Sequence, residues 1–192
     1  SGTVVGCVPA AAAKLADKLW RLRIFHSPDG PERAAQQQLF RAQIALARES
    51  GLPIVIHDRD AHQDVLAILK EEGATENGGV MHCFSGSWET AKAAMSLGMM
   101  ISFAGPLTFT NARQPVEVAA KAPLDMLLIE TDCPYLSPHP FRGKTNEPAR
   151  VVYTAAKLAE IKGLEYQRIE EIILKMPGGY FVLAKLIERK GL

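Results

Sequence analysis

Cysteines, long apolar runs and a charge excess of either sign are all scarce in this sequence. Its 192 residues include three cysteines, Cys7, Cys83 and Cys133, an odd number without C-x-x-C spacing, so we expect no disulfide framework and a reducing, cytoplasmic setting. No apolar run approaches the roughly 18 residues of a membrane helix, and we expect no membrane partner. The formal net charge is only +1, so any site for a polyanion must be local.

Several familiar active-site motifs are also missing. The sequence has no G-x-S-x-G nucleophile elbow, no Walker loop and no dinucleotide-binding fingerprint. Its fractions of apolar residues, 47%, and charged residues, 22%, are those of an ordinary globular protein. A chain of this length can bury a substantial core, and we interpret residues 1–192 as a single domain.

Three short apolar stretches organise the rest of the chain. They are Leu52–Ala61, Gly79–Gly86 and Leu127–Leu136. Each contains a run rich in Val, Ile, Leu or Met, after a leading Gly in the second, and then reaches a polar residue: His57, His82 or Asp132. Uniformly apolar runs of this length are typical of parallel strands that are buried on both faces. Polar residues at the carboxyl ends of such strands are where α/β folds place their chemistry.

Segments with helical periodicity alternate with these stretches. We expect helices at Glu32–Ser50, Ala61–Glu71, Ser87–Leu97, Asn111–Lys121 and Glu165–Lys175, and another that follows Pro148 and ends at Gly163. Met99–Ala104 is expected to be a further strand, and Thr3–Pro9 and Leu19–Phe25 are weaker strand candidates. The strand–helix alternation predicts an α/β fold, either a (β/α)8 TIM barrel incomplete at its N-terminus or an open α/β sheet.

A metal ion explains why two histidines and an aspartate end three neighbouring strands. Neutral imidazole and carboxylate oxygens are the usual ligands of hydrolytic Zn²⁺ or Mn²⁺ centres. Asp132 could bind the metal or accept a proton from water. A lone histidine is more often a satisfied core or surface residue, and for His26, His62 and His139 we expect solvated side chains.

Glu130 lies two residues before Asp132, on the same face of its predicted strand. Two interpretations are equally open from the sequence. The carboxylate either supports a metal ligand from behind or is a core acid paired with Lys or Arg.

Four cationic side chains follow predicted strands. They are Arg59, Arg113, Arg142 and Lys144. If these segments share one mouth of the fold, they form a cationic rim for phosphates; dispersed surface charge is the alternative.

Four motifs follow one another along the chain: LPIVIHDRDA, MHCFSGS, ISFAGPLTF and LLIETDCPYLSPHPFRGKTNEP. In sequence and in order they closely resemble motifs of the TatD-like metal-dependent deoxyribonucleases, a family of amidohydrolase-type TIM barrels. The resemblance runs from about Phe25 to Leu164. It implies a (β/α)8 barrel that holds one or two divalent metal ions (Zn²⁺, Mg²⁺ or Mn²⁺) and cleaves phosphodiester bonds in DNA.

The resemblance also implies roles for individual residues. His57 and His82 match two metal-binding histidines of the family, and Asp132 matches its aspartate that is both a metal ligand and catalytic. Arg142 and Asn146 belong to the family's RGK-NEP segment. With Arg59 and Lys144 we expect them to contact DNA phosphates.

Other family features are not matched. The chain has no H-x-H pair, and Leu19 stands where the family carries a glutamate ligand. Val8 stands where a further histidine is expected. Three of six family ligands remain, which predicts impaired activity. The alternatives are an amidohydrolase-type enzyme for a small molecule, or an inactive remnant that binds a partner. Exposed strand edges also make a homodimer possible.

Overall fold

The computed structural model of the chain describes residues 20–25, 32–73 and 78–175. Among them, five parallel strands form one sheet in the order β1-β2-β3-β4-β5. The strands are β1 (Trp20–Phe25), β2 (Ile54–Arg59), β3 (Gly79–His82), β4 (Met99–Phe103) and β5 (Leu127–Ile129). The expected strand at Thr3–Pro9 and the apolar segment at Tyr180–Ile187 lie outside the described residues.

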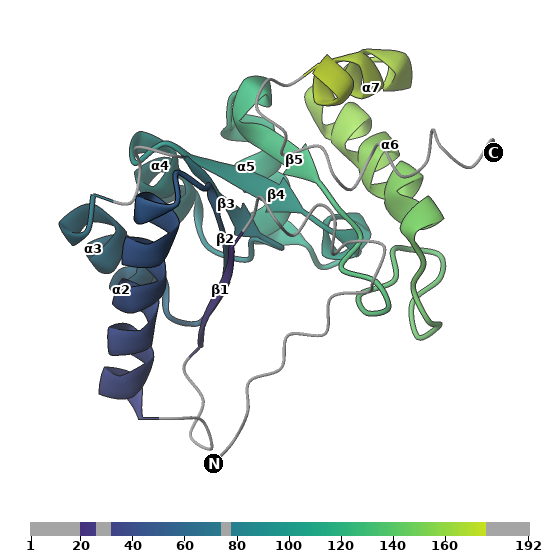
Figure 1. Cartoon of the computed structure of the whole chain (residues 1–192). Coiled ribbons are helices and arrows are strands. Elements are labelled where there is room, and N and C mark those ends of the chain that lie inside the picture. Colours follow the sequence, from purple (N-terminus) through teal and green to yellow (C-terminus); the bar gives the residue numbers. More distant parts are fainter. Residues whose placement is uncertain (1–19, 26–31, 74–77, 176–192) are drawn as a thin grey trace.

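Helices follow the strands, as the alternation predicted (Figure 1). They are α2 (Arg33–Glu49), α3 (His62–Glu71), α4 (Trp88–Ser96), α5 (Arg113–Lys121), α6 (Val151–Lys162) and α7 (Tyr166–Lys175). Short 3-10 turns lie at Gly105–Thr108, Leu124–Met126 and Pro148–Arg150. None of the helices that the structure describes is long and apolar enough to cross a membrane.

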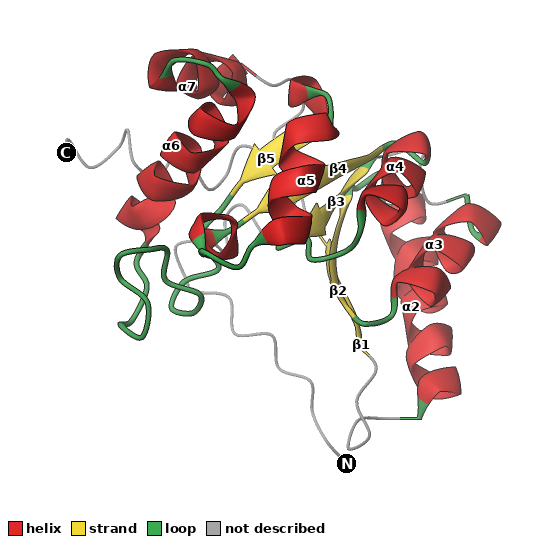
Figure 2. Ribbon diagram, turned by 180° about the vertical axis from the view of Figure 1, so that it is seen from behind, coloured by secondary structure: helices red, strands yellow, loops and turns green. Residues whose placement is uncertain are grey.

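The two faces of the sheet differ, because side chains alternate along each strand. In β2, Ile54 and Ile56 are buried in the main hydrophobic core with side chains from the helices, while Val55 and His57 on the other face are only half-buried. The parallel register pairs Val55 with Val80 and His57 with His82. The helices thus cover one face of the sheet (Figure 2), and the histidines lie on the other.

Two helix ends show how local sequence sets the fold. The side chain of Ser87 caps α4 by accepting a hydrogen bond of 3.2 Å from the N–H of Thr90, as its position predicted. Gly163 ends α6 in the left-handed conformation, with φ of 63°. The stretch Gly79–Gly86 is a strand only as far as His82: Cys83 leaves the strand conformation with φ of 46°, although the N–H of Phe84 still donates to the carbonyl of Ser102 in β4 at 2.9 Å.

Candidate metal centre

His57 and His82 lie on the same face of two neighbouring strands: His82 ends β3, and His57 lies two residues before the end of β2. They are register partners in β2 and β3, and their ring centroids are 5.7 Å apart. Val55 and Val80 form the preceding pair on that face, so the imidazoles sit above an apolar floor. The structure therefore brings together, at the carboxyl edge of the sheet, two of the residues that the sequence singled out.

Glu130 directly follows β5, and its carboxylate reaches His82. Its N–H donates to the carbonyl of Phe103 at 2.8 Å, and the residue is only 4% exposed. One carboxylate oxygen, Oε2, is bonded to Nδ1 of His82, and the other, Oε1, accepts the backbone N–H of Cys83. In the part of the chain that the structure describes, Glu130 is bonded to His82 and Cys83 and pairs with no Lys or Arg; that it supports a metal ligand stays a prediction.

Asp132 approaches the opposite side of the His82 ring. Its Oδ1 lies 3.2 Å from Nε2 of His82. The backbone of Asp132 has φ of 52°, in the left-handed region that few residues other than glycine adopt without cost. Such strained conformations concentrate where a side chain has to be aimed at a site. The imidazole of His82 is therefore held between two carboxylates, one at each ring nitrogen.

The geometry of His82 and Asp132 fits two ligands of one cation. Nitrogen and oxygen ligands at about 2.0–2.2 Å from one metal ion are roughly 3.0–3.5 Å apart, and the observed separation of 3.2 Å lies in that range. Among the described residues, no group of three or more His, Cys, Asp and Glu side chains is arranged to hold an ion. His57 is beside this pair, and the three-ligand set of His57, His82 and Asp132 stays a prediction.

A second histidine–carboxylate pair lies behind the site, and the sequence did not reveal it. Asp58 projects from β2 on the side opposite to His57; its Oδ2 is 2.5 Å from Nδ1 of His62, and its Oδ1 accepts the N–H of Ala61 at 3.1 Å. Asp58 is buried, and this bond raises the pKa of His62 above its ordinary value, although partial burial opposes the rise. His62 is partly exposed and pairs with Asp58, a contact that the sequence did not predict. No helical spacing indicated it, because Asp58 lies in β2 and His62 begins α3.

Asn146 fastens the loop that follows Asp132. Its side-chain amide donates to the carbonyls of Thr131, at 2.8 Å, and Tyr135, at 2.7 Å, and its oxygen accepts the N–H of Glu147 at 2.9 Å. Asn146 is only 4% exposed. The buried amide is bonded to the backbone of the loop, which argues against the predicted contact of Asn146 with a DNA phosphate.

Gly105 fixes the position of the same loop from the other side. A Cβ atom added at Gly105 would lie 2.0 Å from the carbonyl oxygen of Leu136 and 2.9 Å from the nitrogen of Pro138. Only glycine allows this approach of two backbone segments. The 3-10 turn after β4 thus seats the loop beside Asp132.

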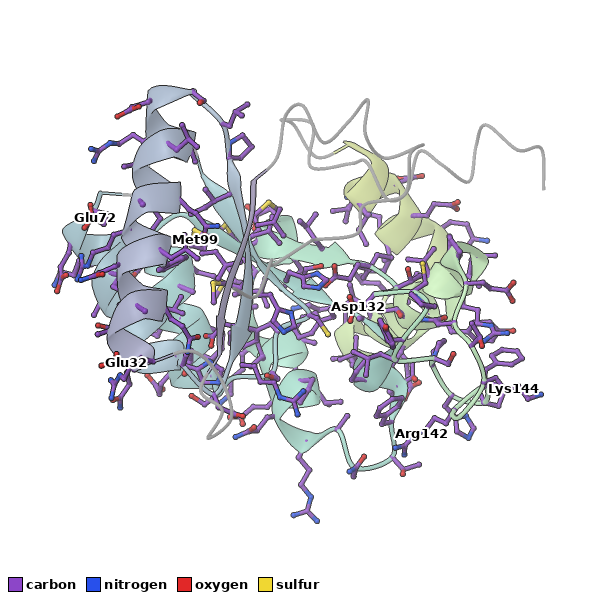
Figure 3. All side chains as sticks on the ribbon, turned by 60° about the horizontal axis from the view of Figure 1, so that its bottom comes forward. Glu32, Glu72, Met99, Asp132, Arg142 and Lys144 are labelled. Atoms are coloured by element: carbon purple, nitrogen blue, oxygen red, sulfur yellow. The ribbon has the colours of Figure 1, made fainter. Side chains whose placement is uncertain are left out.

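The predicted cationic side chains lie in different places. Arg142 and Lys144 are exposed and line one groove beside the loop, and Figure 3 shows them beyond Asp132. Arg59 is exposed at the end of β2, two residues after His57, and Arg113 is exposed at the start of α5. Only Arg142 and Lys144 line the same groove; a cationic rim that also includes Arg59 and Arg113 stays a prediction.

Comparison with known proteins gives this arrangement a context. The chain is 56% identical over 137 residues to the uncharacterized metal-dependent hydrolase YabD of Bacillus subtilis, a match that covers 71% of this chain and 54% of YabD. It is 44% identical over 151 residues to the uncharacterized metal-dependent hydrolase YcfH of Escherichia coli K12, covering 79% of this chain and 56% of YcfH. The chain thus spans about half the length of these relatives.

A solved structure shows the same fold. The crystal structure of YJJV, a TatD homologue from Escherichia coli, superimposes with a TM-score of 0.76 at 31% identity, over 84% of this chain and 61% of YJJV. The expected TIM barrel class is thereby confirmed, and β1–β5 are five parallel strands of such a barrel. The family model of the TatD related DNases matches residues 24–181, most of the chain. This protein belongs to the TatD related DNase family.

Proposed function

We propose that the chain is a metal-dependent hydrolase that cleaves phosphodiester bonds in DNA. The observation that carries this proposal is the arrangement of His82 between Glu130 and Asp132. The names of YabD and YcfH, which describe metal-dependent hydrolases, and the family match support the reaction class. The groove with Arg142 and Lys144 favours an anionic substrate over a neutral small molecule.

Glu130 determines which nitrogen of His82 can bind a cation. Glu130 Oε2 is bonded to Nδ1, so a neutral His82 with its proton on Nδ1 would present the lone pair of Nε2 to a cation on the side of Asp132. The backbone N–H of Cys83 satisfies the other carboxylate oxygen, so the carboxylate cannot rotate without losing a bond. Carboxylates placed in this way fix the ring and increase its basicity as a ligand.

His82 and Asp132, with His57 beside them, would hold the divalent cation. Such a cation lowers the pKa of water and neutralises charge that develops on phosphoryl oxygens. The side chain of Asp132 is 18% exposed, so part of it lies at the surface beside the groove. We assign to Asp132 the acceptance of the proton from the attacking water.

The cationic side chains would hold the substrate. Arg142 and Lys144 lie on the loop that Asp132 begins, so a phosphate they contact is close to the proposed reaction centre. Arg59 extends from the same face of β2 as His57 and would approach the DNA strand from the side opposite to Arg142 and Lys144. DNA as the partner remains part of this proposal, as does the cytoplasmic setting.

A cleavage assay tests the proposed function. Single-stranded and double-stranded DNA are incubated with the full chain and Mg²⁺ or Mn²⁺, beside the variants Asp132→Asn and Asp125→Asn. Asp125 is exposed in a 3-10 turn and serves as the matched control. We expect metal-dependent cleavage that Asp125→Asn keeps and Asp132→Asn loses. Absence of cleavage with either cation, or cleavage that persists in Asp132→Asn, would contradict the proposal.

A further inference from the structure

A groove beside Asp132 combines an exposed aromatic ring with two cations. Its volume is ≈ 600 Å³, and the side chains important here are those of Phe109, Tyr135, Arg142 and Lys144. None of the described residues that line it is acidic. The groove therefore suits a ligand that carries negative charge and a flat apolar group.

Tyr135 is the most exposed large hydrophobic side chain in the described part of the chain, at 70% of its surface. Its backbone is nevertheless held on both sides. The N–H donates to the carbonyl of Asp132 at 3.0 Å, and the carbonyl accepts from the amide of Asn146 at 2.7 Å. A tyrosine has only two side-chain torsions to order, so a ring on a fixed backbone binds a flat partner at a small entropic cost.

Arg142 is held at the groove by a neighbouring ring. Its guanidinium carbon lies 4.1 Å from the centroid of Phe109. This cation–π contact uses the face of the guanidinium and leaves the N–H donors at its edge. Within the described ranges, neither Arg142 nor Lys144 forms a salt bridge, so their charges are available for an anion.

We propose that this groove is a nucleotide subsite, in which Tyr135 stacks on an unpaired base and Arg142 and Lys144 contact the phosphates on either side of it. The inference rests on the proposed function, because it places the bound nucleotide next to the phosphodiester that water would attack beside Asp132. A base inside a duplex has both faces covered, so stacking on Tyr135 requires an unpaired or frayed nucleotide. Tyr135 would then determine how the strand is positioned, without reading its sequence.

Binding measurements without cleavage separate this inference from the proposed activity. Fluorescence anisotropy of the full chain is measured in EDTA with a labelled octathymidylate and with an abasic oligomer that has the same number of phosphates. The variants are Tyr135→Leu, which keeps an apolar side chain without a ring, and Tyr135→Phe, which keeps the ring. Tyr153→Leu is the control, since Tyr153 is 38% exposed and does not line the groove.

The expected result is a loss specific to the base. Wild-type protein binds octathymidylate more tightly than the abasic oligomer, and Tyr135→Leu removes this difference, a loss on the order of tenfold for one stacked base. Tyr135→Phe and Tyr153→Leu bind like wild type. The inference is overturned if wild type does not prefer octathymidylate, or if Tyr135→Leu keeps that preference. Loss of cleavage alone, with this binding pattern intact, would count against the proposed function and not against the subsite.

Discussion

Glu130 and His82 are 48 residues apart in the sequence and form a buried bond between carboxylate Oε2 and ring Nδ1. The bond orients the ring so that Nε2 meets Asp132. Two strands that are not neighbours in the sheet, β3 and β5, are thereby tied together at the proposed reaction centre.

The first prediction concerns this bond. Glu130→Gln keeps the shape of the side chain but removes the charge that favours the Nδ1–H form of His82. We expect Mn²⁺ or Zn²⁺ affinity to fall by about 10–100-fold, the range for losing a carboxylate behind a histidine ligand. Isothermal titration calorimetry measures the affinity, with Glu117→Gln on the exposed face of α5 as control. If Glu130→Gln binds the metal ion as tightly as Glu117→Gln does, Glu130 does not support a metal ligand.

The second prediction concerns the pH dependence of stability. Asp58 raises the pKa of His62 in the folded chain, so this pair stabilises the fold fully below the unfolded value of 6.5 and loses that contribution as pH rises through the higher folded pKa. Replacing His62 by Gln should therefore lower the free energy of unfolding more at pH 5.5–6 than above pH 8. Urea unfolding of wild type and His62→Gln across this range measures the difference. A difference in the free energy of unfolding between wild type and His62→Gln that increases with pH would contradict the prediction.

The third prediction separates support of the loop from contact with substrate. Asn146→Ala removes an amide that satisfies two carbonyls and one N–H, and each buried group left unsatisfied costs about 1–3 kcal/mol. We expect a clear drop in the free energy of unfolding, measured by urea, with exposed Asn111→Ala unchanged. If Asn146→Ala is as stable as wild type but binds DNA more weakly, the result would favour a phosphate contact of Asn146 and contradict this prediction.

The fourth prediction concerns Arg142. Arg142→Ala should lower the free energy of unfolding by no more than about 1 kcal/mol, because the side chain is exposed and its contact with Phe109 is a surface cation–π interaction. DNA affinity should fall, and the slope of its logarithm against the logarithm of salt concentration should decrease by about 1, the value for one phosphate contact. Anisotropy titrations at several salt concentrations measure the slope. Lys92→Ala, an equal charge change on the exposed side of α4, is the control, and a similar slope for both variants would contradict the prediction.

The elements that periodicity defines were predictable from the sequence. The helix at Glu32–Ser50 is observed as Arg33–Glu49, and within the weaker strand candidate Leu19–Phe25 the structure describes the strand Trp20–Phe25. The places of His57 and His82 were predictable as well, because parallel strands end at a common edge. Patterns within one segment were enough for these conclusions.

Contacts between segments could not be read in the same way. The bond between Glu130 and the N–H of Cys83 depends on the positive φ of Cys83. No glycine at this position indicated such a conformation in the sequence. Asn146 was taken for a ligand-binding residue because it stands in a motif beside basic residues, whereas its role depends on the path of the loop around it. The pairing of Asp58 with His62 required knowing that alternate residues of β2 face the helices.

The central claim is that His82 and Asp132 bind the same divalent cation, and a calorimetric titration of the full chain with Mn²⁺ or Zn²⁺ tests it most directly. Wild type, His82→Ala, Asp132→Asn and the control His139→Ala are compared; His139 is exposed and belongs to the loop after Asp132. The account predicts one binding event that His139→Ala keeps and that each of the other two variants weakens by at least about tenfold. Unchanged affinity in both His82→Ala and Asp132→Asn, or no binding in wild type, would contradict it.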